Sequence, residues 1–379
     1  MPRRLIPLLA LLALLVVLAG ALLVLRGRPE LAGPAQPSTG AGGAWYEVYF
    51  TAPKYPDRPE DRHGGIDERF VAFLDSAQRS LDVAIYDFDL ANAAEALARA
   101  AQRGVTVRMV IDSDTLTNTR DAEIQAALRT VRAAGIPIVP DEREAIMHHK
   151  FVVKDGVEVW TGSWNFTVGD TYRLNNNAAR LRSPELAANY AAEFRKMFES
   201  HQFGPSKPPG VPHPVVTING ARVETLFAPQ DEVASHIAAR LREARQSIRF
   251  LAFSFTHDGI AQALLDRAAA GVAVSGVFER TGSQTRFSEY GKLKEAGLEV
   301  YQDGNPYAMH HKVFIIDERT TLFGSFNFSD GADKSNDENL LIVDDPGFAR
   351  LFLEEFDRMI AAAKNPPPRR GRTSRERPR

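Results

Sequence analysis

The fold of this chain is decided by the stretch His148-His-Lys-Phe-Val-Val-Lys-Asp155-Gly-Val-Glu-Val-Trp-Thr-Gly162-Ser-Trp-Asn165, because the same pattern occurs a second time. The second copy reads His310-His-Lys-Val-Phe-Ile-Ile-Asp317-Glu-Arg-Thr-Thr-Leu-Phe-Gly324-Ser-Phe-Asn327. Every shared position is displaced by 162 residues, without a gap. A long spaced pattern that recurs in register indicates a duplicated structural unit whose two copies have a chemical role.

The residues around the motif predict its local structure. Apolar runs on both sides of Lys154-Asp-Gly156 are typical of a β-hairpin. On the first strand His148 and Lys150 point to one face, and the return strand brings Ser163 and Asn165 towards them. The hairpin therefore presents an imidazole, an ammonium, a hydroxyl and a carboxamide, which together can bind a tetrahedral oxyanion and transfer a proton.

The repeat extends beyond the motif and predicts the fold class. The apolar runs 80–86 and 247–253 indicate buried strands, and each is followed by an Ala- and Leu-rich helical stretch that ends at a glycine, Gly104 or Gly271. Strands then alternate with helices along each copy. This order predicts an α/β fold of two tandem units with largely parallel or mixed sheets.

Composition marks the ends of the two units. The run Leu5–Leu25 has no charged residue and, at 1.5 Å per residue, is about 30 Å long, enough for a membrane anchor. A cleaved signal peptide is the alternative, because Ala19 and Ala21 could form a cleavage site. We therefore expect an anchor or signal peptide at 1–25, a flexible linker at 26–44, repeat units at 45–205 and 213–364, and a disordered basic tail at 365–379.

Charge and cysteine content exclude several functions. There is no cysteine, which excludes disulfides, Cys-ligated metals and a thiol nucleophile. Four Arg and one Glu precede residue 45, and six Arg and one Glu follow residue 365, so the two ends carry charges of +3 and +5. Because the net charge of the whole chain is −2, the body between them has a net charge of −10. Such a body is not typical of a general nucleic-acid-binding protein. With the apolar N-terminus, it predicts a cell-membrane protein with its body outside the cytoplasm, or a secreted or periplasmic one.

The duplicated pattern resembles the HxK(x)4D(x)6GSxN signature of the phospholipase D superfamily, over most of residues 45–364. The resemblance implies two α/β/α units around a pseudo-twofold axis, with one motif from each half in a single active site. It also implies cleavage of phosphodiesters through a phosphohistidine intermediate, with no obligatory metal and no other cofactor.

The resemblance also implies roles for individual residues. The expected catalytic residues are His148, Lys150, His310, Lys312 and Glu338. The expected phosphate-binding residues are Lys150, Ser163, Asn165, Lys312, Ser325 and Asn327. The motif aspartates, Asp155 and Asp317, are expected to have a structural role, and their position beside a turn fits it.

The two copies differ where the superfamily often has a carboxylate that hydrogen-bonds a catalytic histidine. Position 176 is Asn, whereas the equivalent position 338 is Glu. If this pairing crosses between the halves, Glu338 orients His148 as the nucleophile and leaves His310 as the general acid. If it does not cross, the two roles are exchanged. We favour the crossed arrangement, on the resemblance rather than on the sequence itself.

Three functions within the superfamily remain open. Hydrolysis of phospholipid to phosphatidate and an alcohol is favoured by the apolar N-terminus and the acidic body. A nuclease is the alternative, because the stretch Gly324–Ser329 resembles that branch closely. A phosphatidyltransferase such as a cardiolipin synthase uses the same intermediate. A non-catalytic binding protein is disfavoured, because both copies keep a complete polar set, and two motifs in one chain predict a monomer.

Overall fold

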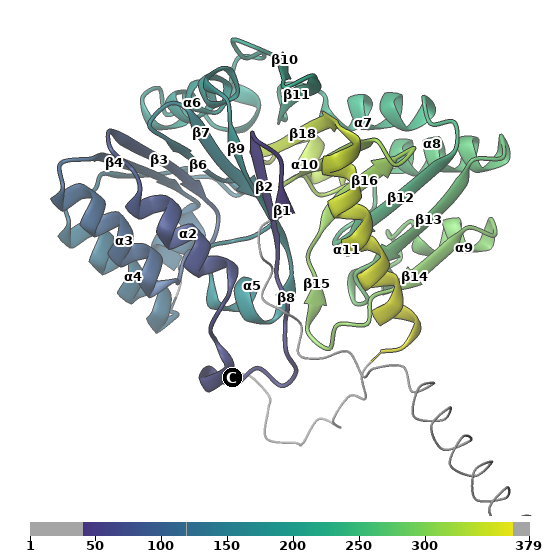
Figure 1. Cartoon of the computed structure of the whole chain (residues 1–379), viewed down its shortest axis with the longest axis horizontal. Helices are drawn as coiled ribbons and strands as arrows, with labels where there is room; N and C mark the ends of the chain where they lie inside the picture. Colours follow the sequence, from purple (N-terminus) through teal and green to yellow (C-terminus); the bar gives the residue numbers. More distant parts are fainter. Residues whose placement is uncertain (1–40, 119, 367–379) are drawn as a thin grey trace, which may run out of the picture. The chain divides into compact units, whose positions relative to one another are not determined.

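The computed structural model describes residues 41–118 and 120–366, which form two mixed sheets with helices on their faces (Figure 1). In spatial order, the first sheet contains β1 (Ala41–Gly42), β2 (Tyr46–Phe50), β9 (Asn177–Arg182), β7 (Glu158–Gly162), β6 (Lys150–Lys154), β3 (Ser80–Ile85), β4 (Thr106–Ile111) and β5 (Ile138–Pro140). The strands β3, β4 and β5 are parallel, and the other neighbours are antiparallel.

The second sheet repeats this order and these directions. It contains β10 (Val215–Ile218), β11 (Ala221–Ala228), β18 (Glu338–Asp344), β17 (Thr320–Gly324), β16 (Lys312–Ile316), β12 (Ser247–Ala252), β13 (Ala273–Phe278) and β14 (Glu299–Gln302). The prediction of a mixed α/β fold is thus confirmed. The predicted N-terminal anchor or signal, most of the linker and most of the basic tail lie outside the described residues.

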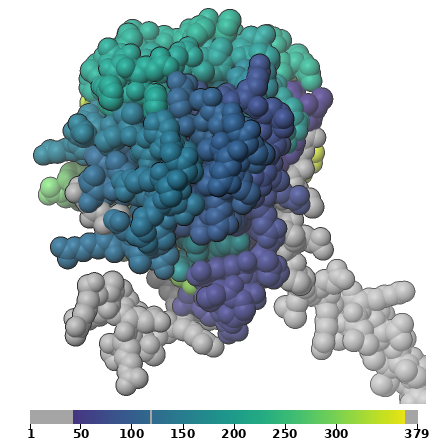
Figure 2. All heavy atoms as spheres, turned by 90° about the vertical axis from the view of Figure 1, so that its left-hand side faces the viewer, coloured from purple at the N-terminus to yellow at the C-terminus, as the bar shows by residue number. Residues whose placement is uncertain are grey.

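Helices cover both faces of each sheet (Figure 1). The outer layer of the first half consists of α2 (Ile66–Asp75), α3 (Ala91–Gln102) and α4 (Ala122–Ala133), and that of the second of α7 (Val233–Arg242), α8 (Asp258–Ala269) and α9 (Tyr290–Glu295). Figure 2 shows the first half from its outer side, with the blue residues of its helical layer towards the viewer. No helix within residues 41–118 and 120–366 is both long and apolar enough to cross a membrane.

The two halves share one hydrophobic core. The long helices α6 (Pro184–Phe198) and α11 (Pro346–Lys364) pack on the inner faces of the sheets, where Phe194 and Phe352 are fully buried. Their side chains join a cluster that contains Val153 of β6 and Val313 of β16. Because burial of apolar area is the main stabilising term in folding, this common core holds the two motif hairpins in a fixed relation.

Each motif aspartate ties its hairpin to the beginning of the neighbouring strand. The carboxylate of Asp155 accepts hydrogen bonds from the backbone N–H groups of residues 78–80, at 2.6 to 3.1 Å. Asp317 accepts the equivalent bonds from residues 245–247, at 2.7 to 2.9 Å. Partial burial alone would raise the pKa of both carboxyls, but these hydrogen bonds outweigh it and lower the pKa below its usual value.

These hydrogen bonds predict a stabilising role for Asp317 that is separate from chemistry. We expect Asp317→Ala to lower the free energy of unfolding by about 2 kcal/mol or more at pH 7, because three N–H donors lose a charged acceptor. The exposed Glu295, changed to Ala, is the control and should shift it by less than about 0.5 kcal/mol. Urea unfolding measures both.

The pH dependence of this difference follows from the lowered pKa of Asp317. The stabilisation is fully present above the ordinary carboxyl pKa of about 4 and is lost as the pH falls through the lower pKa of the folded state. The gap between the wild type and Asp317→Ala should therefore close in acid. Equal stability of Asp317→Ala and the wild type at pH 7 would refute the assignment.

Candidate active site

Two backbone hydrogen bonds cross between the halves beside the motif histidines. The N–H of His148 donates to the carbonyl of Asp337 in the second half, at 2.9 Å. The N–H of His310 donates to the carbonyl of Asn175 in the first half, at 2.8 Å. The residue that follows each acceptor is thereby carried to the histidine of the opposite half.

The crossed pairing brings Glu338 to His148. Both carboxylate oxygens of Glu338 lie 2.8 Å from Nδ1 of His148, and both side chains are buried. Burial raises the pKa of Glu338 to about 8, and burial, followed by the charge of Lys150, lowers the pKa of His148. The ionised form of Glu338 accepts the proton of Nδ1, and this arrangement leaves the lone pair of Nε2 available for attack.

His310 has a different pair of neighbours. Its Nδ1 lies 2.9 Å from Oδ1 of Asn176 and 3.4 Å from Oδ1 of Asp170. Burial, followed by the charge of Lys312, lowers the pKa of His310 to about 4, and Asp170 opposes this shift. The sequence did not indicate Asp170, because it lies outside the repeated motif and the equivalent residue, Ala332, is apolar.

The motif lysines lie beside the histidines in the same way in both halves. Each Nζ donates to the carbonyl of the motif histidine two residues earlier, at 2.9 Å for Lys150 and 3.0 Å for Lys312. Each ammonium also faces an aromatic ring, Tyr86 at 5.1 Å and Phe253 at 4.8 Å. Burial lowers the pKa of Lys150 to about 8 and also lowers that of Lys312. Two buried ammonium groups favour an anion between them.

The motif serines bond to the segments that carry Asn176 and Glu338, the residues next to the motif histidines. The hydroxyl of Ser163 donates to Oδ1 of Asn176 at 2.8 Å and accepts the N–H of Asn177 at 3.1 Å. Ser325 accepts the N–H of Asn339 at 3.0 Å. Both serines are fully buried and hold the beginning of the next strand. Direct contact of these hydroxyls with phosphate stays a prediction.

The motif asparagines have free hydrogen-bonding capacity. Nδ2 of Asn165 lies 3.3 Å from Oδ1 of Asp170, whereas the side-chain oxygens of Asn165 and Asn327 are buried without a partner. These oxygens only accept hydrogen bonds, so a phosphate would have to bind the amide nitrogens instead. Their role in phosphate binding remains a prediction.

A close approach of two strands explains the glycine of the motif. A Cβ atom on Gly162 or Gly324 would lie 2.3 Å from the backbone oxygen of Asn177 or Asn339, respectively. Any other residue would push these strands apart. The same strands carry Asn165 and Glu338 into the site region, so the glycine preserves its geometry.

The second histidine of each motif points away from the first, as the alternation of a strand requires. His149 lies between Oε1 of Glu193, at 3.6 Å, and Nδ2 of Asn339, at 3.3 Å. Nε2 of His311 is 2.8 Å from Glu355. These histidines are fully buried and connect the strands to the central helices α6 and α11.

One group of side chains in the described ranges has metal-ligand spacing, and it contains His149, Glu193 and Asp337. The ammonium of Lys207 bonds to Glu193 and lies 2.5 Å from Oδ1 of Asp337, while Arg143 binds the other oxygen of Asp337 at 2.6 Å. Cationic side chains thus already neutralise these carboxylates. The group lies behind the site and includes neither His148 nor His310.

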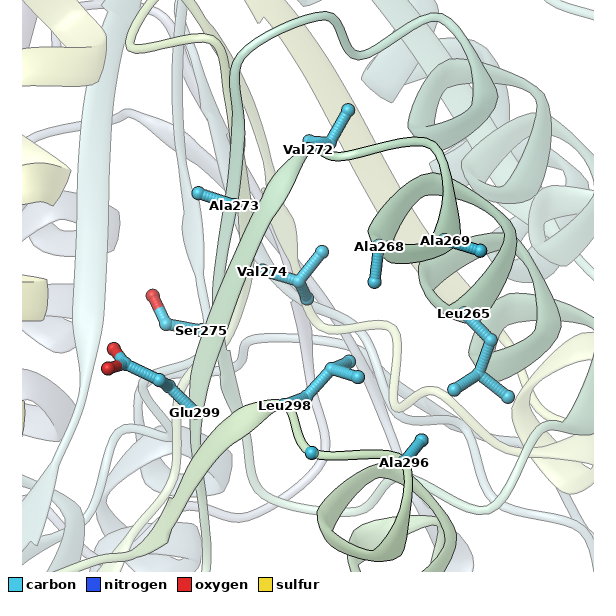
Figure 3. A pocket seen from close by; sticks show the side chains of 11 residues that line it. Leu265, Ala268, Ala269, Val272, Ala273, Val274, Ser275, Ala296, Leu298 and Glu299 are labelled. Atoms are coloured by element: carbon cyan, nitrogen blue, oxygen red, sulfur yellow. The ribbon is translucent and has the colours of Figure 1, made fainter.

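A groove of about 590 Å³ lies elsewhere in the second half (Figure 3). It is lined by the end of α8 and by residues at and just before the beginnings of β13 and β14, including Leu265, Val272 and Leu298. The site lies at the opposite end of this sheet, because Lys312 pairs with Ala252, the last residue of β12, which runs parallel to β13. The groove is therefore separate from the site.

Comparisons with known proteins agree with this geometry. The family described as "Cardiolipin synthase, PLD-like domain" matches residues 70–198 and 237–360, one segment in each half. A phospholipase D from Rickettsia bellii is 34% identical over 150 residues, which cover 39% of this chain and 75% of the relative. The mitochondrial cardiolipin hydrolase of Homo sapiens is 36% identical over 129 residues, covering 34% of this chain and 51% of the relative.

A solved structure extends the likeness to both halves. The phosphatidylserine synthase of Haemophilus influenzae has a TM-score of 0.60 at 15% identity, covering 79% of this chain and 84% of that one. At this identity the likeness shows the fold alone. With the family match on both halves, the chain belongs to the phospholipase D superfamily and is an enzyme of phosphodiester chemistry.

The protonation of Lys150 predicts an alkaline limit to activity. Because its pKa is lowered to about 8, the ammonium predominates below that pH and is lost above it. The fall of kcat/KM with pH begins at the low pKa of His310, and we expect it to become steeper above a pH of about 8, whereas kcat, which reports the complex with bound phosphate, shows this limit at a higher pH. Initial rates over a pH series measure both, and a kcat/KM whose slope does not change near that pH would contradict the role of this charge.

Proposed function

We propose that the chain hydrolyses phospholipid to phosphatidate and an alcohol through a phosphohistidine on His148. The observation that carries the proposal is the contact of Glu338 with Nδ1 of His148 across the halves. It supports a neutral imidazole with a free Nε2, in a site where two buried ammonium groups attract the phosphate.

The first step forms the covalent intermediate. The Nε2 lone pair of His148 attacks phosphorus, and the bond from phosphorus to the alcohol oxygen breaks. The negative charge of the bound phosphodiester raises the low pKa of His310 and favours a proton on its Nε2, and His310, on the opposite side, gives that proton to the leaving oxygen. Lys150 and Lys312 stabilise the charge on the non-bridging oxygens in place of a metal ion.

The second step returns the enzyme to its first state. His310, now neutral, takes a proton from water as the water oxygen attacks phosphorus. The phosphorus–nitrogen bond breaks, phosphatidate leaves, and His148 regains its lone pair. If a second alcohol takes the place of water, the same residues perform transfer.

The charge beside the site supports a lipid rather than a nucleic acid. Asp87 and Asp89 follow the strand β3, and burial raises the pKa of each to about 6, so both are anions at neutral pH. The equivalent residues of the second half are Ser254 and Thr256. A polynucleotide would carry further phosphates past these carboxylates, whereas a phospholipid brings one. The names of the relatives, phospholipase D and cardiolipin hydrolase, support the same choice. The apolar run Leu5–Leu25 supports a membrane location.

The test is a substrate panel with the purified full chain in EDTA. We expect phosphatidate from vesicles of phosphatidylcholine or cardiolipin and no cleavage of single-stranded DNA. Ethanol in the assay separates hydrolysis from transfer, because transfer yields phosphatidylethanol. Cleavage of DNA alone would replace the proposal with a nuclease, and loss of activity in EDTA that zinc or calcium restores would overturn the metal-free mechanism.

Variants show whether one site requires both halves. We expect His148→Ala and His310→Ala each to reduce turnover by about 100-fold or more. The control is His236→Ala. This side chain is 46% exposed, and its Nδ1 lies 3.2 Å from Oε1 of Glu224. Full activity in either motif variant would show that one motif is not part of the chemistry.

A further inference from the structure

The two halves each place one carboxylate beside the histidine of the other half, but on different residues. The second half has Ala332 and Glu338, and the first half has Asp170 and Asn176 at the same two positions, again displaced by 162 residues. The acidic group of the first copy thus lies six residues earlier in the sequence. The chemical partner that Asn176 cannot provide is available from Asp170.

The contacts of Asn176 show how the pair works together. Its Nδ2 donates to Oδ1 of Asp170 at 3.0 Å and to the backbone oxygen of Asp170 at 3.1 Å. Because a carboxylate only accepts hydrogen bonds, Asp170 fixes the amide with its nitrogen inward and its oxygen towards His310. Oδ1 of Asn176 then accepts the proton of His310 Nδ1 at 2.9 Å.

Asp170 is itself held firmly in one position. It lies in the first turn of the short helix α5 (Val168–Tyr172), and the hydroxyl of Thr167 donates to its Oδ2 at 3.1 Å. The N–H of Asn165 donates to Oδ1 at 3.1 Å. Asp170 is 6% exposed, and although burial raises its pKa, His310 and these hydrogen bonds outweigh burial and keep the pKa below its usual value. A buried anion therefore lies 3.4 Å from Nδ1 of His310.

We propose that Asp170 is the positioning carboxylate of His310, and that through Asn176 it orients the imidazole and holds its proton for the leaving group. His148 meets its carboxylate directly, whereas His310 meets an amide with the carboxylate beside it. The first arrangement favours a neutral nucleophile, and the second keeps the proton donor in place with its shortest contact to the amide, at 2.9 Å, and the carboxylate further away, at 3.4 Å. The inference rests on the proposed role of His310 as general acid.

The test compares leaving groups in the full-length protein. Asp170→Asn is measured in single turnovers with bis(p-nitrophenyl) phosphate, whose leaving group needs little protonation, and with diphenyl phosphate, whose leaving group needs more. We expect release of phenol to slow by about 100-fold and release of nitrophenol by less than about tenfold. A purely structural lesion would slow both to the same extent, and that result would overturn the proposal.

A rescue variant distinguishes chemistry from folding. The double variant Asp170→Ala/Asn176→Glu rebuilds the arrangement of the second half, Ala332 and Glu338, in the first. We expect Asp170→Ala alone to lose activity like Asp170→Asn and the double variant to recover to within about tenfold of the wild type. If the double variant is as thermally stable as the wild type but does not recover activity, a carboxylate at position 176 cannot replace the one at position 170, and the proposed role of Asp170 is contradicted. The control is Asp330→Asn, the exposed acid of the corresponding helix α10 (Asp330–Lys334), which should change nothing.

A second readout needs no substrate. In protein labelled with ¹⁵N-histidine, the imidazole resonances of His310 report its tautomer and pKa, and His310→Gln assigns them. We expect Asp170→Asn to lower the pKa of His310 and to leave that of His148 unchanged. An unchanged His310 would overturn the proposal. If the wild type cleaves neither diester but His310 still shifts, the proposed function fails while the positioning by Asp170 stands.

Discussion

The site depends on two backbone hydrogen bonds that cross between the halves, from His148 to Asp337 and from His310 to Asn175. Side chains alone would leave the partner of each histidine open, because either half contains residues of the right kind. The backbone contact removes this freedom, since it sets Glu338 next to His148 and Asn176 next to His310. Each half therefore lacks the group that orients its own histidine, and the duplicated fold provides one complete site.

The site is also a concentration of buried charge, which is costly in the absence of an anion. Lys150 and Lys312 are fully buried, and the carboxyl groups of Glu338 and Asp170 contact Nδ1 of His148 and His310, respectively. Removing ions from water costs several kcal/mol for each ion, and partial pairing repays only some of it. The apolar area buried in the common core around α6 and α11 stabilises the fold and offsets this cost. A bound phosphodiester adds negative charge between the lysines, so binding relieves the destabilisation in the place where the reaction requires it.

The sequence predicted much of this arrangement from period and spacing. The hairpin, the strand pairs and the helix ends at Gly104 and Gly271 follow from local patterns, and the structure confirms them. The alternation of a strand likewise separates His148 from His149. These features are local, so a sequence carries them directly.

Other parts of the site depend on contacts between distant residues, which no local pattern encodes. Asp170 lies in the short helix α5 and has no acidic counterpart in the second copy, so the repeat could not indicate it. Lys207 lies between the two expected units, 45–205 and 213–364, yet it is buried against Glu193 and Asp337. The serines are a third case, because Ser163 and Ser325 bond to neighbouring strands that only the tertiary fold brings close.

In the proposed mechanism His148 attacks phosphorus, and Glu338, from the other half, orients it for the attack. The most direct measurement is mass spectrometry of the His310→Ala protein after reaction with bis(p-nitrophenyl) phosphate and an alkaline quench, because this variant forms the intermediate but cannot activate water. Trypsin separates the two motifs into the peptides Glu144–Lys150 and Glu295–Lys312. We expect a nitrophenyl phosphoryl group on His148 in the first peptide, and its loss when Glu338 is also changed to Gln. The same group on the second peptide of the wild-type protein, with none on the first, would contradict it.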